Sequence, residues 1–434
     1  MNFDLPEGWV LKTLSSCCTE TISYGIVQPG THDDDGVPVV RVNNFTKNGL
    51  ELSDVLRVSQ SVNDKYKRTV LKGGEVLLTL VGSTGQSVIV PDSMAGWNVP
   101  RAIAVLRVSD EVGAEWVNCC LQSPIVKHFL DARANTTVQK TLNLKDVKDI
   151  PIPVPPTEYK EKALGALVSL AQKLDNNRQT NQTLEHMAQT IFKSWFVDFE
   201  PVKAKMSGEQ PEGMDAATAS LFPEKLVESE LGLIPEGWEV TKLSKVIDLL
   251  NGFAFKSPDY VKEGTFVLRT KNFDSSNSVE RLGDDVYLPD EFLESHKKYL
   301  CEAYDYHVVM VAASIGKTAM IYPHQLPALR NQNMWCFRPK DESLRFYTKY
   351  MVDGLVKLNM GLASGSARAF FKKGDFNSYE FALPTSELLV KFNDVVGNLV
   401  KQKGSLLNQN VQLAAMRDTL LPKLLSGEIE LEVR

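Results

Sequence analysis

The sequence carries one pattern twice, with the second copy displaced by 229 residues. The segment Leu5-Pro6-Glu7-Gly8-Trp9 recurs as Ile234-Pro235-Glu236-Gly237-Trp238. The same displacement relates Leu14-Ser15 to Leu243-Ser244, and Asn181 to Asn410. A displacement that stays nearly constant over most of a chain indicates an internal duplication. We therefore expect two similar modules and two similar connectors, an arrangement that suits a linear target with two parts.

Length and charge set limits on what the modules do. With 434 residues in total, each repeat is long enough to bury its own core. The net charge of −6 argues mildly against nucleic-acid binding by the chain as a whole. However, residues 156–230 contain 12 acidic and 8 basic residues, so much of the acidic excess lies in the connector. A locally basic face on either module remains compatible with this composition.

The sequence favours a cytoplasmic protein. No apolar run approaches the roughly 18 residues of a membrane span, and the N-terminal segment does not resemble a signal peptide. The 6 cysteines form no Cys-x-x-Cys pair, which favours buried, reduced thiols.

Each repeat opens with a region of short β-like runs separated by glycine and proline, as in a compact sheet domain. The clearest runs span 37–42, 75–81, 265–269 and 307–311, and helical stretches are expected near 116–130 and 344–358. Each region closes with a proline-bearing run, 150–155 or 379–384, and proline confines such a strand to a sheet edge or an exit. These features predict a mixed α/β module in each half.

The period changes after each module, and apolar residues then recur at three-four spacing. The pattern predicts one long helix over 157–196 and a second over 386–421, with Thr157 and Ser386 as N-caps. Helices of about 35 to 40 residues are roughly 50–60 Å long. Since helices of this length need a partner, we expect the two to form an antiparallel coiled coil.

The apolar stripe of both helices is interrupted by a polar residue at the same repeat position. Asn181 and Asn410 either face each other and fix the helix register, or simply face solvent. The sequence favours neither interpretation over the other.

The connectors carry the most specific motifs. Residues 191–202, 211–217, 228–238 and 416–429 resemble the conserved regions of type I restriction-modification specificity subunits. The likeness covers nearly the whole chain, and it is strong in the connectors and weak inside the modules.

The resemblance implies a fold and a function. It implies an α+β chain in which two target-recognition domains each read one half of a bipartite DNA site, while the paired helices set the spacer. The expected segments are a first recognition domain (1–155), a first long helix (156–200), a linker (201–230), a second recognition domain (231–384), and a second long helix with the C-terminal tail (385–434). It implies as partners double-stranded DNA, two modification (methyltransferase) subunits and restriction subunits. S-adenosylmethionine, ATP and Mg are then expected in the partner subunits, and this chain is expected to be non-catalytic.

Signatures of catalysis are absent or incomplete. The chain lacks the Asn/Asp-Pro-Pro-aromatic motif of amino-methyltransferases. Gly316-Lys317-Thr318 ends like a P-loop, but the required first glycine is replaced by Val311. The segment 31–42 has threonine and valine at the first and last ligand positions of a calcium loop, which favours a solvated acidic loop. Two alternatives stay open: a fused methyltransferase-specificity enzyme and a duplicated coiled-coil adaptor for proteins.

Candidate DNA contacts lie in the modules. The turns 83–86 and 314–317 follow β-like runs, and their small residues let backbone approach a phosphate, although plain β-turns explain them equally well. Arginine and asparagine suit guanine and adenine edges, yet residues repeated in both halves suit a structural role equally. Because modules that read different sequences should differ at base-reading positions, basic residues peculiar to one half are the better base-reading candidates. The full set is Arg41, Asn44, Ser83, Gln86, Arg101, Lys140, Arg269, Asn272, Lys317, Arg368, Lys372 and Lys373.

Overall fold

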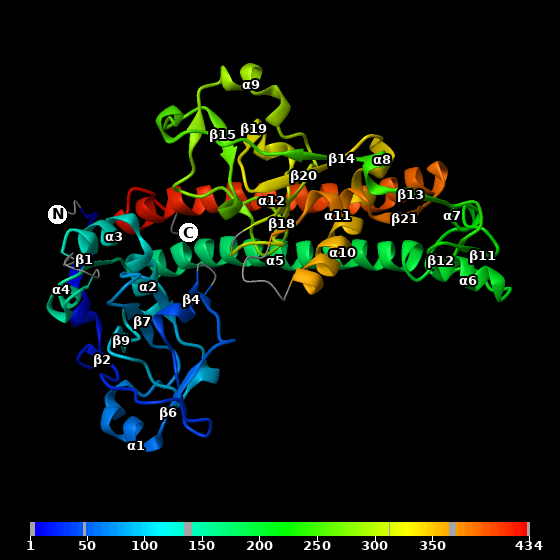
Figure 1. The fold of residues 1–434 in the computed structure, drawn as a ribbon. Helices are drawn as coiled ribbons and strands as arrows, with labels where there is room; N and C mark the ends of the chain where they lie inside the picture. Colours follow the sequence, from blue (N-terminus) through cyan, green and yellow to red (C-terminus); the bar gives the residue numbers. More distant parts are fainter. Residues whose placement is uncertain (1–4, 47–48, 134–140, 312, 364–369, 432–434) are drawn as a thin grey trace. The chain divides into compact units, whose positions relative to one another are not determined.

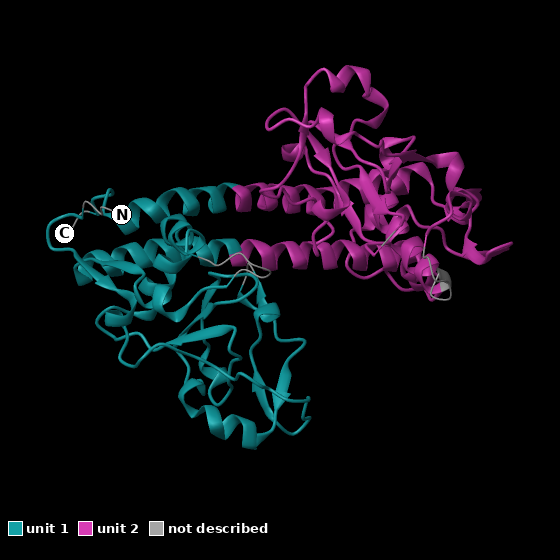
Figure 2. Ribbon diagram, turned by 60° about the vertical axis from the view of Figure 1, so that its left-hand side comes forward, with its two compact units in different colours: residues 1–174, 412–434 teal, residues 175–411 magenta. Residues whose placement is uncertain are grey.

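The structure is a computed structural model that describes the chain except for residues 1–4, 47–48, 134–140, 312, 364–369 and 432–434. The described residues form two compact units, 1–174 with 412–434 and 175–411 (Figures 1 and 2). Each unit contains an α/β region and part of two long helices, α5 (Thr157–Phe196) and α12 (Ser386–Ser426). The expected fold, two mixed α/β regions with two long helices packed together, is confirmed.

The first unit is built around a four-stranded antiparallel sheet with the order β2-β9-β7-β8. Its strands are β2 (Ser23–Tyr24), β9 (Ile103–Leu106), β7 (Val76–Thr79) and β8 (Ser87–Ile89). Smaller two-stranded sheets join β3 (Val37–Val39) to β6 (Leu56–Val58), β4 (Phe45–Thr46) to β5 (Gly49–Leu50), and β1 (Val10–Thr13) to β10 (Pro151–Val154). The helices are α1 (Gln60–Asn63), α2 (Ala114–Gln122), α3 (Pro124–Asp131) and α4 (Leu144–Lys148). The proline-bearing strand β10 is therefore an edge strand of a two-stranded sheet, as its sequence predicts.

The second unit repeats this topology. Its four-stranded sheet has the order β14-β20-β17-β18, with β14 (Ile247–Asn251), β20 (Met334–Pro339), β17 (Tyr306–Val309) and β18 (Thr318–Met320). A second sheet contains β15 (Thr265–Leu268) between antiparallel β16 (Tyr287–Leu288) and parallel β19 (Ala328–Arg330). Two antiparallel pairs complete it: β13 (Glu239–Lys242) with the distant β21 (Glu380–Leu383), and the hairpin of β11 (Leu226–Ser229) with β12 (Gly232–Pro235). The helices are α6 (Glu200–Met206), α7 (Ala216–Ser220), α8 (Leu243–Val246), α9 (Phe292–Ser295), α10 (Arg345–Ala363) and α11 (Lys373–Asn377).

A glycine enforces the same close approach in both units. A Cβ on Gly25 would lie 1.8 Å from the carbonyl oxygen of Val99, and a Cβ on Gly252 would lie 1.7 Å from that of Asn331. Any side chain at either position would collide with backbone. The two glycines therefore fix one strand end against a loop in each α/β region.

The long helices pack against each other within each unit. In the first, Tyr159 Oη donates to the carbonyl oxygen of Leu424 at 3.1 Å. In the second, Asn177 contacts Asn410, and Glu185 pairs with Lys403. Residue numbers rise along α5 as they fall along α12, so the pairing is antiparallel (Figure 1).

The buried side of α5 follows a seven-residue period. Its members at this interval are Lys160, Leu167, Leu174, Asn181, Ala188 and Trp195, all buried. A strict seven-residue repeat is the pattern of a left-handed coiled-coil seam. The three-four spacing of the sequence therefore corresponds to the side of α5 that is buried by packing.

The helix starts and ends differ in detail from the prediction. In the second helix the cap is Thr385, one residue before Ser386, because Thr385 Oγ1 accepts a hydrogen bond from the Leu388 N–H at 3.4 Å. The same helix continues through Pro422 to Ser426, past the expected end near Leu421. Among the described residues, no helix combines the length and apolar character that a membrane span requires.

Candidate nucleic-acid interface

The two hairpin turns proposed from the sequence are structurally equivalent. In the first unit, Gly85 N–H donates to the carbonyl of Thr79 at 2.9 Å; in the second, Gly316 N–H donates to the carbonyl of Val309 at 2.9 Å. Both glycines have positive φ, 81° and 80°. The residue after each glycine is exposed, and it is Gln86 in one unit and Lys317 in the other. The loop is one residue longer in the second unit (309–316 against 79–85), but both turns close on a glycine and present different side chains after it, as readers of different sequences require.

Asn44 and Asn272 are buried and engaged within their own units. Asn44 Oδ1 accepts the Arg41 N–H at 2.8 Å, and its Nδ2 donates to the carbonyls of Glu51 and Asp54 at 2.9 Å each. Asn272 makes the equivalent bond with Arg269 at 3.0 Å. These contacts favour the structural interpretation of the repeated motif over DNA contact.

The two arginines of this motif are half-buried and paired with nearby acids. Arg41 Nη2 lies 2.7 Å from Asp54 Oδ2, while Arg269 Nη2 donates to the carbonyl of Asp284 at 2.7 Å. Ser83 is exposed at the hairpin turn of the first unit. Of these three candidates, only Ser83 is presented without a charged partner among the residues described.

The candidates peculiar to one half fall into three groups. Arg101 is exposed in the turn before β9, where the second unit has Gln332: Arg101 N–H donates to Ile26, and Gln332 N–H makes the matching bond to Phe253. Lys372 is exposed beside α11, whereas Lys373 donates to the carbonyl of Leu249 at 2.7 Å. Lys140 and Arg368 lie outside the described residues. Arg101 and Lys372 therefore remain the best-placed base-reading candidates.

Both units share a pair that the sequence did not reveal, in which a buried acid contacts a partly buried arginine. Glu75, just before β7, lies 3.4 Å from Arg107 Nε, just after β9. Asp305, just before β17, binds Arg338 of β20 at 2.9 Å and 2.5 Å. Burial alone would raise the pKa of Asp305, but the hydrogen bond from Arg338 lowers that pKa below its usual value. Glu75 and Asp305 are 230 residues apart, and Arg107 and Arg338 are 231 apart, so neither match follows the displacement of 229 residues that relates the repeated motifs.

The polar seam of the long helices matches neither of the two interpretations of Asn181 and Asn410 in full. Asn410 Oδ1 accepts a hydrogen bond from Asn177 Nδ2 at 2.9 Å, one turn of α5 before Asn181. Asn181 is buried, and its Oδ1 meets no donor among the described residues. By repeat position, Asn177 corresponds to Leu406, so divergence at this site explains why Asn410 has a partner and Asn181 Oδ1 has none.

A buried ionic network joins the second α/β region to both long helices. Lys349 of α10 is fully buried and contacts the carboxylates of Glu185 and Asp353. Lys403 of α12 donates to Glu185 Oε2 and to the carbonyl of Ser276, each at 2.9 Å. Burial would raise the pKa of Glu185, but the two ammonium groups lower this pKa to about 2. The network therefore stays ionised at neutral pH.

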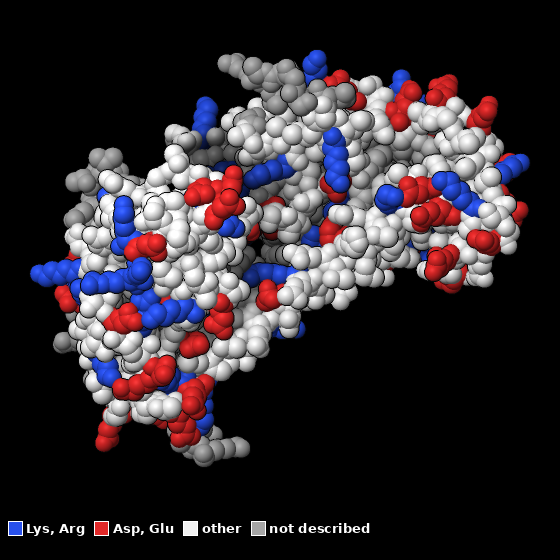
Figure 3. Space-filling model, turned by 90° about the horizontal axis from the view of Figure 1, so that it is seen from below, with Lys and Arg blue, Asp and Glu red and all other residues white. Residues whose placement is uncertain are grey.

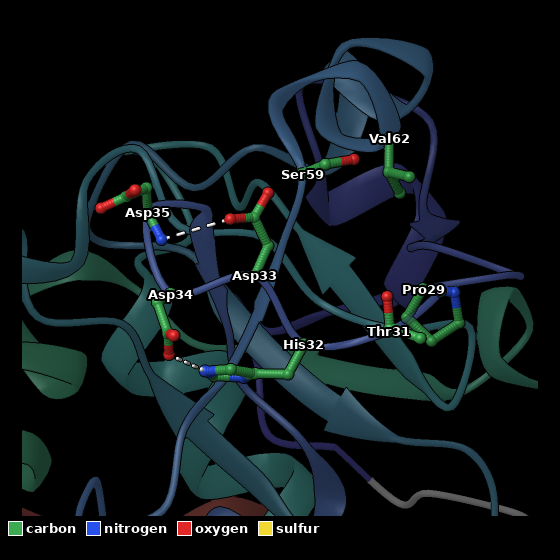
Figure 4. A pocket seen from close by; sticks show the side chains of 9 residues that line it. Pro29, Thr31, His32, Asp33, Asp34, Asp35, Ser59 and Val62 are labelled. Atoms are coloured by element: carbon green, nitrogen blue, oxygen red, sulfur yellow. Dashed lines mark hydrogen bonds and ion pairs between the residues drawn. The ribbon is translucent and has the colours of Figure 1, made fainter.

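Potential metal ligands lie close together in two places among the described residues. Asp305, His307 and Cys336 place donor atoms within 4.8 Å of one another, but Arg338 and Arg345 already occupy the Asp305 carboxylate. The loop 29–35 lines a hollow of about 470 Å³ in the first unit. Its Asp33, Asp34 and Asp35 side chains point in different directions, and Asp34 pairs with His32 at 3.2 Å (Figure 4). Neither place presents a set of convergent free ligands.

Charges on the surface are mixed. On the face in Figure 3, Lys and Arg side chains lie among Asp and Glu side chains and form no continuous basic field. With a net charge of −6, DNA binding by this chain depends on individually placed cations.

Comparison with known proteins follows the duplication. The chain matches the type I restriction modification DNA specificity domain over residues 6–186 and again over 235–402. It is 28% identical over 396 residues to the type I restriction enzyme HindI specificity subunit of Haemophilus influenzae, covering 80% of this chain and 81% of the relative. It is 22% identical over 363 residues to the MjaIX specificity subunit of Methanocaldococcus jannaschii, covering 83% and 78%. The crystal structure of the type I S subunit from M. genitalium shares the fold, with a TM-score of 0.50 at 15% identity over 98% of this chain and 97% of that chain.

Proposed function

Because the chain belongs to the type I restriction-modification DNA specificity family, in which it is the non-catalytic subunit that determines the DNA target, we propose that its two α/β regions each read one half of a bipartite, asymmetric site. The observation that carries this proposal is one scaffold present twice with different exposed tips. Gln86 and Arg101 in the first region stand where Lys317 and Gln332 stand in the second. The recognition domains are then residues 1–155 and 231–384, and the chain acts in the cytoplasm beside the DNA it reads.

The long helices set the spacer between the half-sites. Their seven-residue seam and antiparallel pairing give a stiff element with one preferred register, which is what a fixed number of unread base pairs requires. The polar contact between Asn177 and Asn410 supports a fixed register, because shifting the helices would leave the buried Asn177 amide without this acceptor.

Two modification subunits dock on the helices, and restriction subunits join them. Met187 of α5 and Met416 of α12 occupy the same repeat position, and they are 45% and 51% exposed. Exposed methionines adapt well to a partner surface. Two equivalent apolar positions suit two copies of one partner, and S-adenosylmethionine, ATP and Mg are bound by those partner subunits.

A footprint of the chain reconstituted with its modification subunit tests this function. Two protected patches should appear, centred about one helical turn apart if both regions use the major groove. Gln86→Ala should weaken protection of one patch, and Lys317→Ala should weaken the other. A single continuous patch, or loss of both patches with either substitution, would contradict independent reading of two half-sites.

A further inference from the structure

The partly buried Arg107 and Arg338 also hold a segment of backbone in their units. In the first unit, Arg107 Nη1 donates to the carbonyl of Arg68 at 2.8 Å, and its Nη2 donates to that of Val70 at 2.9 Å. These carbonyls belong to the 3-10 turn Asp64–Thr69 and the residue that follows it. Arg107 itself pairs with Glu20 at 2.9 Å and with the buried Glu75 at 3.4 Å, and these two carboxylates hold the guanidinium that fixes the turn.

The second unit holds the equivalent turn in the same way. Arg338 Nη2 donates to the carbonyl of Leu300 at 3.0 Å, and Asp305 fixes Arg338. A further buried arginine, Arg330, donates to the carbonyls of Lys298 and Leu300. The held segment is the 3-10 turn Lys297–Tyr299.

Each turn displays two adjacent cations. Lys67 and Arg68 are exposed in the first unit, and Lys297 and Lys298 are exposed in the second. In the part of the chain that the structure describes, none of the four side chains forms an ion pair with a carboxylate. A paired surface cation has a partner to lose on binding, whereas these four are available to an external anion.

The surroundings of the turns suit a large anionic ligand. Beside the first turn lies a hollow of about 570 Å³, lined by Tyr24, Lys65, Lys67 and Arg68, with Asp64 as the only acidic lining residue. Beside the second turn, Lys298 Nζ lies 5.0 Å from the ring centroid of Tyr299, which packs against Phe253. Both turns therefore combine fixed backbone, free positive charge and a nearby aromatic ring.

The duplication indicates which part of DNA the turns meet. At the hairpin tips the residue types differ between the units, as expected of base readers. At the turns the charge is retained: Lys67 and Arg68 correspond to Lys297 and Lys298 at a displacement of 230 residues. The phosphate backbone is the one part of DNA that does not change with sequence, so a retained cationic pair fits phosphate and not base edges.

We propose that the Lys67-Arg68 and Lys297-Lys298 turns are the phosphate-binding clamps of the two recognition domains, one for each half-site. The proposal rests on the DNA-reading function above. The clamps place each domain on the duplex without contributing to sequence choice, and the base-reading residues then act from a fixed position.

The test is the salt dependence of DNA binding by the complex reconstituted with modification subunits. Affinity for the target duplex and for a random duplex of equal length is measured by fluorescence anisotropy at several salt concentrations. The double variants K67Q/R68Q and K297Q/K298Q are compared with K225Q/K242Q, which removes the same charge from lysines already paired with Glu236 and Glu380. Since all substituted side chains are at least partly exposed, thermal melting should not change.

Each clamp variant should weaken binding to both duplexes by roughly ten- to fiftyfold near 0.1 M salt, and should reduce the salt slope by about 2. The ratio of target to random affinity should stay as in the unsubstituted complex, and the control should bind normally. Unchanged slopes, an equal effect of the control, or a changed target-to-random ratio would each overturn the clamps. If the unsubstituted complex preferred no sequence, the proposed function would be refuted instead. The salt dependence of binding to the random duplex would still show whether the clamps contact phosphates.

Discussion

At the scale of single residues, retention between the repeats has two different physical meanings. Asn44 and Asn272 are retained and buried, and their amides tie a loop to the domain. The cationic pairs 67–68 and 297–298 are retained and exposed, and among the described residues none of these four side chains pairs with a carboxylate. Burial is therefore the observation that separates a scaffold residue from a ligand-binding one when a sequence repeats itself.

The helix seam gives a residue-scale prediction in which the same substitution has opposite effects at equivalent positions. Asn181→Leu removes a buried oxygen without a donor, and should raise the free energy of unfolding by about 1 kcal/mol. Asn410→Leu deprives Asn177 of an acceptor and should lower it by about 1 kcal/mol. Urea unfolding followed by tryptophan fluorescence measures both.

The two variants serve as controls for each other, because they make the same chemical change at one repeat position. An equal loss of stability in both variants would contradict the difference between Asn410, which has a hydrogen-bond partner, and Asn181, whose Oδ1 has none. If Asn181→Leu also broadened the accepted spacer lengths, Asn181 would contribute to register despite its missing donor.

The candidate site was only partly predictable from sequence. The hairpin tips at Gln86 and Lys317 follow from turn chemistry after a β-like run, and the structure places them equivalently. Arg107 and Arg338, which hold the clamp turns, were not predictable, because the displacement between equivalent residues varies inside the module and reaches 231 residues at this pair. Pairing between distant strands, which brings Glu75 beside Arg107, is not encoded in local pattern.

At the scale of elements, the second recognition domain is tied to the helices by charge. Lys349 links α10 to Glu185 of α5, and Lys403 of α12 binds the same carboxylate. The position in the first repeat that corresponds to Lys403 is Leu174, and the position that corresponds to Glu185 is Ala414 in the second helix. Duplication thus kept the seam while one half acquired a buried ionic network.

This network predicts a pH dependence. Glu185 has a folded pKa of about 2, below its ordinary value of 4.5, so its stabilisation is present above pH 4.5 and is lost as pH falls toward 2. Glu185→Gln leaves two buried ammonium groups without their shared carboxylate, and should cost about 3 kcal/mol at neutral pH. The difference in the free energy of unfolding between the natural chain and Glu185→Gln should decrease as the pH falls below 4.5.

Urea unfolding at a series of pH values checks this, with Glu161→Gln, at an exposed position of the same helix, as the matched control. The control should follow the unsubstituted protein throughout. A gap that stays constant from neutral to acidic pH would show that Glu185 is not the titrating group.

The elements themselves were largely predictable. The first long helix begins at Thr157 and ends at Phe196 as expected, because three-four spacing over many turns is a strong signal. The continuation of the second helix through Pro422 was not predicted, since proline normally ends a helix pattern. The expected helix near 116–130 is two helices that meet at Ser123, whose side chain caps the second.

At the scale of the whole molecule, we propose that the paired helices hold two independent readers at a fixed separation along DNA. The family supplies the role in target recognition, and the duplicated scaffold supplies the two readers. The length of the helices should then determine how many base pairs separate the half-sites, and the base-reading residues should have no influence on that number. This claim concerns distance, so it is tested by changing distance alone.

The decisive measurement is methylome sequencing of cells that carry the partner subunits with either the natural chain or a lengthened variant. The variant repeats residues 174–180 in α5 and residues 403–409 in α12, which keeps the seven-residue seam and adds about 10 Å. The natural chain should produce a split methylated motif, and the variant should keep both half-sites with a spacer longer by about three base pairs. The same spacer in both strains, or altered half-sites, would contradict the claim.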